Sequence, residues 1–216
     1  MSISENVFER SGESTMSARG FYGALALIVA FGLWLSSLVA AEFAAWQPSI
    51  VVTLLVGLGI PILGILIATK SDNPALSFIG YLMVAVPFGM LLGPTLNQYS
   101  PEVVQKAMFY TAATTLVMGT AGVLYPNFFS KIGGALFMAL IGLVVVRLIG
   151  MFVPSLGNMS VIDSISAGIF SLYIGYDMHR ASVMPHTMNN AVDAALSLYL
   201  DIINLFLSLL RIFSRD

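Results

Sequence analysis

Hydrophobic residues dominate the chain from residue 20 onward, and short polar or charged clusters interrupt them at regular intervals. Each apolar stretch is long enough to cross a lipid bilayer as a helix, which takes about 20 residues. The expected bounds are 20–41, 49–69, 75–96, 106–126, 132–153, 160–178 and 190–213. The pattern predicts an all-α, polytopic integral membrane protein built as a bundle of seven transmembrane helices.

The polar segment before the first apolar stretch comprises residues 1–19 and carries both signs of charge. The apolar stretch that follows is too long for a removed signal peptide and lacks a small-residue cleavage site. The connectors between the predicted helices are short and leave no room for a soluble domain. We therefore expect a single transmembrane domain over residues 1–216 with a polar N-terminal tail.

The overall composition supports a membrane protein. Hydrophobic residues make up 58% of the chain and charged residues 9%, which is too apolar for a water-soluble globule of this length. The nine Lys and Arg residues are scattered singly and the net charge is −2, which argues against nucleic acid as a partner. No cysteine is present, so the chain offers no disulfide and no thiolate metal ligand.

Basic residues indicate which ends of the helices face the cytoplasm. With seven spans, the N-terminus shares a side with the loops that hold Lys70, Lys131 and Arg180. Cytoplasmic loops are enriched in Lys and Arg, so we expect a cytoplasmic N-terminus. Arg211 and Arg215 lie at the opposite end, which leaves open a last segment that does not span fully.

The last predicted helix carries a narrow polar seam through an otherwise apolar surface. At 100° per residue its polar side chains fall within about 80° of one another. They are Asn190, Asp193, Ser197, Asp201, Asn204, Ser208 and Arg211. Asp201 lies about 15 Å of helix before Arg211, near the middle of a bilayer. A carboxylate there costs at least about 2.5 kcal/mol, so Asp201 is expected to face a water-filled path or a protein interior, where it could also be a permanently protonated packing residue.

A second carboxylate, Asp177, lies near the C-terminal end of the sixth predicted helix. A negative charge at a helix C-terminus meets the negative end of the helix dipole, so capping does not explain it. If Asp177 reaches Asp201, both cannot ionise cheaply in a low dielectric, and the pair titrates as one unit. That arrangement would be a proton-operated switch. The alternative is an ordinary solvated aspartate at the membrane interface.

Several further residues are candidates for the same region. Asp193 extends the seam toward the side of Asp177, and Lys70 could be the counter-ion of Asp177 or a lysine that snorkels to the interface. His179 and His186 titrate near neutral pH and could sense cytoplasmic pH, although solvated loop histidines would look the same.

Arg147 and Asp163 lie on the opposite side of the membrane in the predicted topology. We expect the two to neutralise each other or to snorkel toward the interface. A role in an extracytoplasmic vestibule is the second interpretation.

Oxygen ligands from Asp177, Asp201 and Asn204 suit a hard cation such as calcium. No histidine pair at helical spacing offers a transition-metal site. We expect no cofactor, and calcium enters only as a permeant or bound ion.

An enzyme is not expected. No Gly-x-Ser-x-Gly motif occurs, and the last span has no lysine that could form a Schiff base.

The segment 194–213, AALSLYLDIINLFLSLLRIF, closely resembles the C-terminal signature of the transmembrane Bax inhibitor motif family in its bacterial form. Residues 171–177 (SLYIGYD), 134–144 (GALFMALIGLV) and, more loosely, 91–99 (LLGPTLNQY) are also similar to that family. The resemblance covers the chain from about residue 70 onward.

The resemblance implies a seven-helix bundle in a bacterial inner membrane, in which the C-terminal helix is central. It also implies a pH-sensitive leak of cations, chiefly calcium, controlled by an aspartate pair that matches Asp177 and Asp201. Some relatives carry an acid within span two, whereas this chain has none between Gln47 and Lys70. Others act with a membrane-anchored quality-control protease, so a non-transporting regulator of such a partner is the alternative function.

Overall fold

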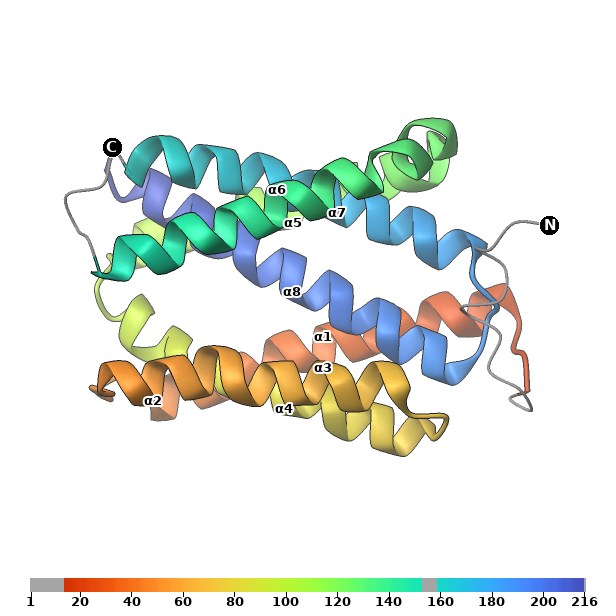
Figure 1. Ribbon diagram of the computed structural model, residues 1–216, viewed down its shortest axis with the longest axis horizontal. Coiled ribbons are helices and arrows are strands. Elements are labelled where there is room, and N and C mark those ends of the chain that lie inside the picture. Colours follow the sequence, from red (N-terminus) through yellow and green to blue (C-terminus); the bar gives the residue numbers. More distant parts are fainter. Residues whose placement is uncertain (1–13, 153–158, 216) are drawn as a thin grey trace. The chain divides into compact units, whose positions relative to one another are not determined.

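The computed structural model describes residues 14–152 and 159–215, which form helices joined by short turns (Figure 1). The helices are α1 (Ala18–Glu42), α2 (Ile50–Leu54), the π-helical η1 (Leu55–Gly59), α3 (Ile60–Lys70), α4 (Pro74–Leu96), α5 (Pro101–Leu124), α6 (Pro126–Phe152), α7 (Met159–Val183) and α8 (Met188–Phe213). Within these described ranges no strand occurs, and the all-α fold class is confirmed.

In the described part of the chain the predicted apolar stretches fall on helices, and α2, η1 and α3 run on as one stretch from Ile50 to Lys70. The stretch predicted over 106–126 runs past the end of α5 at Leu124 and reaches the first residue of α6. Six helices in the described part of the chain are long and apolar enough to cross a membrane. Helix α7 is not among the six, because serines, two aspartates, a histidine and an arginine lower its hydropathy. The chain is thus a multi-pass membrane protein, and the spanning of α7 stays a prediction. Residues 1–13 of the predicted tail and the connector around Pro154 lie outside the described residues.

The start of α5 differs from the sequence prediction, which placed it at residue 106. The helix begins at Pro101, and the Ser100 hydroxyl accepts a hydrogen bond from the Val103 N–H at 3.4 Å. A serine cap followed by proline at the first helical position is a strong start signal. Lys106 therefore lies inside α5, five residues after its first residue.

Pro61, inside the second apolar stretch, follows closely on a wider helical turn. Pro61 has no N–H to donate, and its ring crowds the carbonyl group four residues earlier. The π-helical turn η1 (Leu55–Gly59) comes directly before α3, in which Pro61 occupies the first turn. A π-turn inserts one extra residue and so absorbs a break in the α-helical hydrogen bonds.

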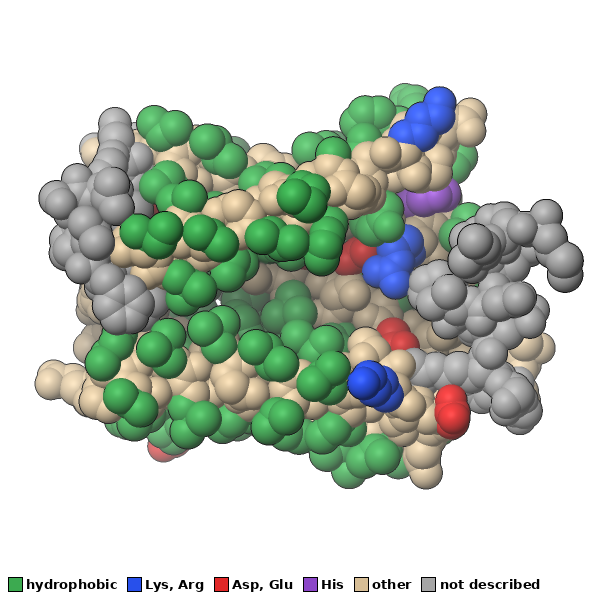
Figure 2. Space-filling model, viewed as in Figure 1, with side chains coloured by type: hydrophobic (Ala, Val, Ile, Leu, Met, Phe, Trp, Pro, Cys, Tyr) green, Lys and Arg blue, Asp and Glu red, His purple; other side chains and the backbone are tan. Residues whose placement is uncertain are grey.

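Exposed hydrophobic side chains run along the helices (Figure 2). Leu27 is 73% exposed, Leu116 is 72% exposed and Val51 is 70% exposed. Apolar patches of this extent on a monomer mark contact with something other than water. In helices of this length they are the surfaces that face lipid acyl chains.

The chain divides into two compact units, which are described one at a time. The first unit comprises residues 1–99 and 183–199, and the second comprises residues 100–182 and 200–216. The first half of α8 belongs to the first unit and its second half to the second unit. The single-domain organisation expected from the sequence stays a prediction.

A buried serine joins three helices of the first unit. The Ser36 hydroxyl lies 2.9 Å from the Ala85 carbonyl oxygen of α4 and 2.6 Å from the Tyr199 hydroxyl of α8. Ser36 is 1% exposed and Tyr199 is fully buried. Buried polar groups are costly unless paired, so these bonds fix the first half of α8 against α1 and α4.

Two glycines set the spacing of α5 and α7 in the second unit. A methyl group on Gly122 would collide with the Gly175 carbonyl oxygen. Small residues at such crossings let helix backbones approach closely in membranes. This close contact fixes the backbone of α7 at Gly175, two residues before Asp177.

We expect Gly122→Ala to destabilise the protein by about 1 to 3 kcal/mol, because the backbone of α7 must move to admit the methyl group. The matched control is Gly134→Ala, since a methyl group there meets nothing within 4 Å. Thermal unfolding of purified protein in detergent measures both. A Gly122→Ala melting temperature at or above that of Gly134→Ala would contradict the close packing.

Candidate functional site

The two aspartates singled out from the sequence lie together in the second unit. Asp177 comes from α7 and Asp201 from α8, and each is 6% exposed. Their carboxyl groups are within hydrogen-bonding contact of each other. The structure therefore brings two acidic side chains, 24 positions apart in the sequence, into one buried contact.

The contact between these carboxyl groups has a chemical requirement. Ionised carboxylates only accept hydrogen bonds, whereas a protonated carboxyl group can also donate one. The Oδ2 atom of Asp201 is buried and meets no hydrogen-bond donor among the described residues. The Asp177–Asp201 contact is thus a hydrogen bond when one proton is present and a repulsive contact when none is.

Arg180 supplies the positive charge nearest to the aspartate pair. Its Nη1 atom lies 3.2 Å from Oδ1 of Asp177, one helical turn away on α7. The guanidinium also lies 6.0 Å from the ring centre of Tyr176. The sequence suggested Lys70 as the counter-ion of Asp177, and Arg180 was not among the candidates. The spacing of three residues between Asp177 and Arg180 was a usable signal, because such residues are neighbours on a helix surface.

The polar seam of α8 continues from Asp201 toward the C-terminal end of the helix. The Asn204 side-chain amide donates to the Leu200 carbonyl oxygen at 2.7 Å. The Ser208 hydroxyl lies 2.8 Å from the Ser166 hydroxyl of α7. Asn204 is half-buried, and its side-chain amide is bonded within α8.

The other candidates from the sequence lie in different places. Lys70 ends α3 in the first unit and is exposed, and Asp193 lies half-buried on the part of α8 that belongs to that unit. Their roles beside Asp177 stay predictions. His179 lies within α7 and is 7% exposed, so it is not the solvated loop residue that the sequence allowed. The His186 ring stacks on Phe21 with ring centres 4.6 Å apart.

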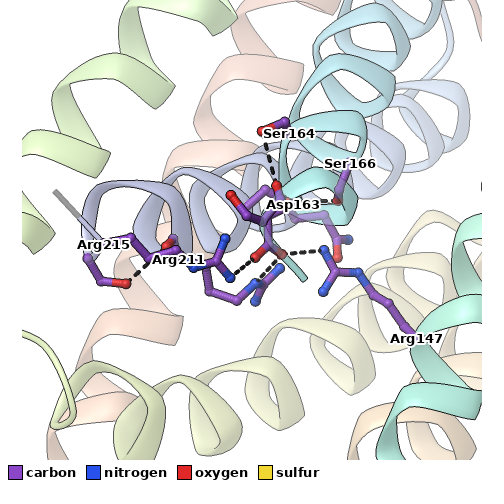
Figure 3. Close-up of polar contacts among 10 residues, drawn as sticks. Arg147, Asp163, Ser164, Ser166, Arg211 and Arg215 are labelled. Carbon is purple, nitrogen blue, oxygen red and sulfur yellow. Dashed lines mark hydrogen bonds and ion pairs between the residues drawn. The ribbon is translucent and has the colours of Figure 1, made fainter. Parts of the chain in front are cut away.

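A second charged cluster lies where α6 and α8 end and α7 begins (Figure 3). Asp163 is 1% exposed, and its Oδ1 atom lies 3.0 Å from Nη2 of Arg147 and 2.7 Å from Nε of Arg211. Its Oδ2 atom lies 2.7 Å from Nη2 of Arg215. The pairing of Arg147 with Asp163 that we expected from the sequence is present, and Arg211 and Arg215 join it.

A family model described as inhibitor of apoptosis-promoting Bax1 matches residues 18–216. The match covers nearly the whole chain, the aspartate pair included. The chain belongs to the Bax inhibitor family.

Relatives of this Bax inhibitor family protein are found in bacteria and in a virus. A membrane protein of Streptococcus pyogenes serotype M3 is 40% identical over 156 residues, which cover 69% of this chain and 67% of the relative. A protein of Helicobacter pylori strain J99 is 36% identical over 56% of this chain and 52% of its own length. The Golgi anti-apoptotic protein of Vaccinia virus strain Lister is 35% identical over 57% of this chain and 52% of its own length.

The acidic groups of this family member do not assemble into a multidentate metal site in the described part of the chain, where no group of three His, Cys, Asp or Glu side chains could hold a metal ion. Asp177 and Asp201 alone supply the acidic oxygens at their contact. Calcium in proteins takes six to eight oxygen ligands.

Proposed function

We propose that this Bax inhibitor family protein is a pH-sensitive leak channel for cations, chiefly calcium, gated by the protonation of Asp177 and Asp201. The observation that carries the proposal is the buried contact of the two carboxyl groups between α7 and α8. Carboxyl groups in membrane helices are rare, expensive and associated with ion paths and proton relays.

The repulsion between two ionised carboxylates at this contact exceeds the energy of a single hydrogen bond between α7 and α8. Two like charges 4 Å apart repel each other by about 4 kcal/mol at the effective dielectric of a protein. An opposing hydrogen bond such as that between Ser166 and Ser208 contributes about 1 kcal/mol. Loss of the shared proton therefore favours separation of α7 and α8 at this contact, whereas one proton holds them together.

Arg180 makes the singly protonated pair stable. Its guanidinium pairs with Asp177, which leaves the proton to be held on Asp201 and donated toward Asp177. With two protons on the pair, Asp177 loses its charge and the ion pair with Arg180 is broken. The singly protonated contact is the closed state, and it is lost when the pair loses its proton.

The proposed topology has seven spans with a cytoplasmic N-terminus in a bacterial inner membrane. Helix α8 is central in it, as the family resemblance implies, and α8 contributes residues to both units. The polar seam of α8, from Asp193 through Asp201 to Asn204, supplies the route for the ion. Lys70 and the two histidines lie on the cytoplasmic side in this topology.

Flux measurements on purified protein test the proposal. We expect liposomes that contain the full chain and an enclosed calcium indicator to take up calcium faster than empty liposomes, at a rate that depends on pH. If the bundle is closed at one pH and open at another, the rate of calcium uptake should differ between them by about tenfold or more, which corresponds to about 1.4 kcal/mol. No flux above that of empty liposomes at any pH would reject the channel.

The alternative function is regulation of a membrane-bound partner, such as a quality-control protease, without transport. The name of the viral relative, a Golgi anti-apoptotic protein, favours a regulatory role of some kind. Under this alternative, Asp177 and Asp201 only fix helix packing. Full partner activity with an Asp177→Asn and Asp201→Asn double variant, together with absence of flux, would support it over the channel.

A further inference from the structure

The cluster around Asp163 contains more positive charge than its carboxylate can neutralise. The guanidinium groups of Arg147, Arg211 and Arg215 all pair with this one aspartate, and arginine stays protonated in proteins. Two of them share a single oxygen atom, Oδ1. The described cluster therefore keeps two formal positive charges on groups that repel each other.

An ordinary structural explanation accounts for only part of this arrangement. Cations are favourable at the C-terminal ends of α6 and α8, and an anion is favourable at the N-terminal end of α7, because of the helix dipoles. One arginine would satisfy the buried aspartate. The second and third add repulsion, which an additional anion would relieve.

The arginines retain surface for such an anion. Their side chains are 32%, 28% and 38% exposed for Arg147, Arg211 and Arg215, whereas that of Asp163 is 2% exposed. Each guanidinium carries five N–H donors in a planar fork that matches phosphate oxygens. The contacts with Asp163 involve one nitrogen of each arginine.

The cluster lies at the depth of lipid headgroups. Arg147 is five residues from the end of α6, Asp163 four from the start of α7 and Arg211 two from the end of α8. Each is thus within about 8 Å of a helix end. In a helix that spans the bilayer, this is the level where acyl chains give way to phosphates.

Neighbouring side chains on α6 and α7 are apolar and exposed. Val145 is 47% exposed, Ile149 is 44% exposed, Val161 is 54% exposed and Ile165 is 54% exposed. They lie two positions from Arg147 or Asp163, at the same level along α6 and α7, and are exposed where lipid acyl chains would pass. A ligand that combines a phosphate with acyl chains would contact both surfaces, whereas free phosphate would use the arginines alone.

Among the described residues, the same end of the second unit carries two further charges. The Lys106 ammonium lies 4.4 Å from the ring centre of Phe213, at the end of α8. Glu102 lies exposed in the first turn of α5. The two offset each other, so the excess positive charge stays that of the arginine cluster.

We propose that Arg147, Arg211 and Arg215, held around Asp163, form a binding site for the phosphate of an anionic phospholipid such as phosphatidylglycerol. Basic pockets between transmembrane helices bind anionic headgroups in this way. The site is independent of the Asp177–Asp201 contact, which lies about 15 Å or more away along α7 and α8.

Titration of the purified full chain in detergent with short-chain lipids, followed by native mass spectrometry, tests the site. We expect phosphatidylglycerol to bind more tightly than zwitterionic phosphatidylcholine. An Arg147→Gln and Arg215→Gln double variant should lose about 30-fold in affinity for phosphatidylglycerol. Arg215→Gln alone, at the most exposed arginine of the cluster, is the variant of choice if the double variant does not fold.

The control is Lys131→Gln, which removes an exposed charge near the other end of α6 and should leave the lipid preference unchanged. Equal binding of the two lipids, or an unchanged preference in the arginine variants, would overturn the site. Competition by inorganic phosphate at the same concentration as the lipid would also overturn the proposal, because it would identify a site for small anions.

Discussion

Calcium flux through the Asp201→Asn variant is expected to be the same across the pH range in which the wild-type rate changes. An asparagine amide can donate a hydrogen bond to a carboxyl oxygen of Asp177 at every pH, whereas Asp201 does so only while it keeps its proton. The variant should therefore hold α7 and α8 together and show the lowest rate that the wild type reaches. Flux assays in calcium-indicator liposomes at a series of pH values measure this.

Two further variants sharpen that comparison. Asp72→Asn removes an exposed carboxyl group between α3 and α4, and the wild-type pH profile should persist in it. Asp177→Asn should also lose the pH dependence, but it should unfold at a lower temperature than Asp201→Asn because it removes the ion pair between Asp177 and Arg180. An Asp201→Asn profile that follows the wild type at each pH would remove the switch, whatever its absolute rate.

Substitution of Asp163 by asparagine is expected to be the most destabilising single charge change in the second unit. It leaves three arginines, each about one-third exposed, without their shared anion. Breaking a buried ion pair on one side costs about 3 to 5 kcal/mol, and the access of water to the arginines reduces this to roughly 2 to 3 kcal/mol. The melting temperature in detergent should fall by roughly 4 to 12 °C.

The control for this prediction is again Asp72→Asn, which deletes an exposed carboxylate and should shift the melting temperature by no more than about 2 °C. Arg147→Gln should cost less than Asp163→Asn, because two arginines still neutralise the aspartate. A melting temperature for Asp163→Asn equal to that of the control would show that the cluster does not hold α6, α7 and α8 together.

The positions of the helices follow from local sequence signals. The last helix was predicted over 190–213 and is found over Met188–Phe213, because its polar seam and apolar remainder repeat with the helical period. The start of α5 was predicted five residues too late, although Ser100 and Pro101 carry a strong helix-start signal. Helix α7 was found as expected, but its polar residues exclude it from the six helices that qualify as spans.

The partners within each charged site were harder to predict. The helical period places Asp201 in the seam. Which basic side chain pairs with Asp177 depends on the directions of the side chains, and for that reason the sequence suggested Lys70 where the structure has Arg180. The cluster at Asp163 shows the same limit. Its pairing with Arg147 was expected, whereas Arg211 and Arg215 joined it only because three helix ends meet in the second unit, which no local pattern encodes.

Infrared spectroscopy of the protonated carboxyl group tests the shared proton of Asp177 and Asp201 most directly. At the pH of lowest flux, the wild-type protein should show the C=O band of one hydrogen-bonded carboxylic acid. Asp177→Asn and Asp201→Asn should each lack it, since the remaining carboxylate then accepts a hydrogen bond from the new amide. A wild-type spectrum without this band, or a band that persists in both single variants, would contradict the account.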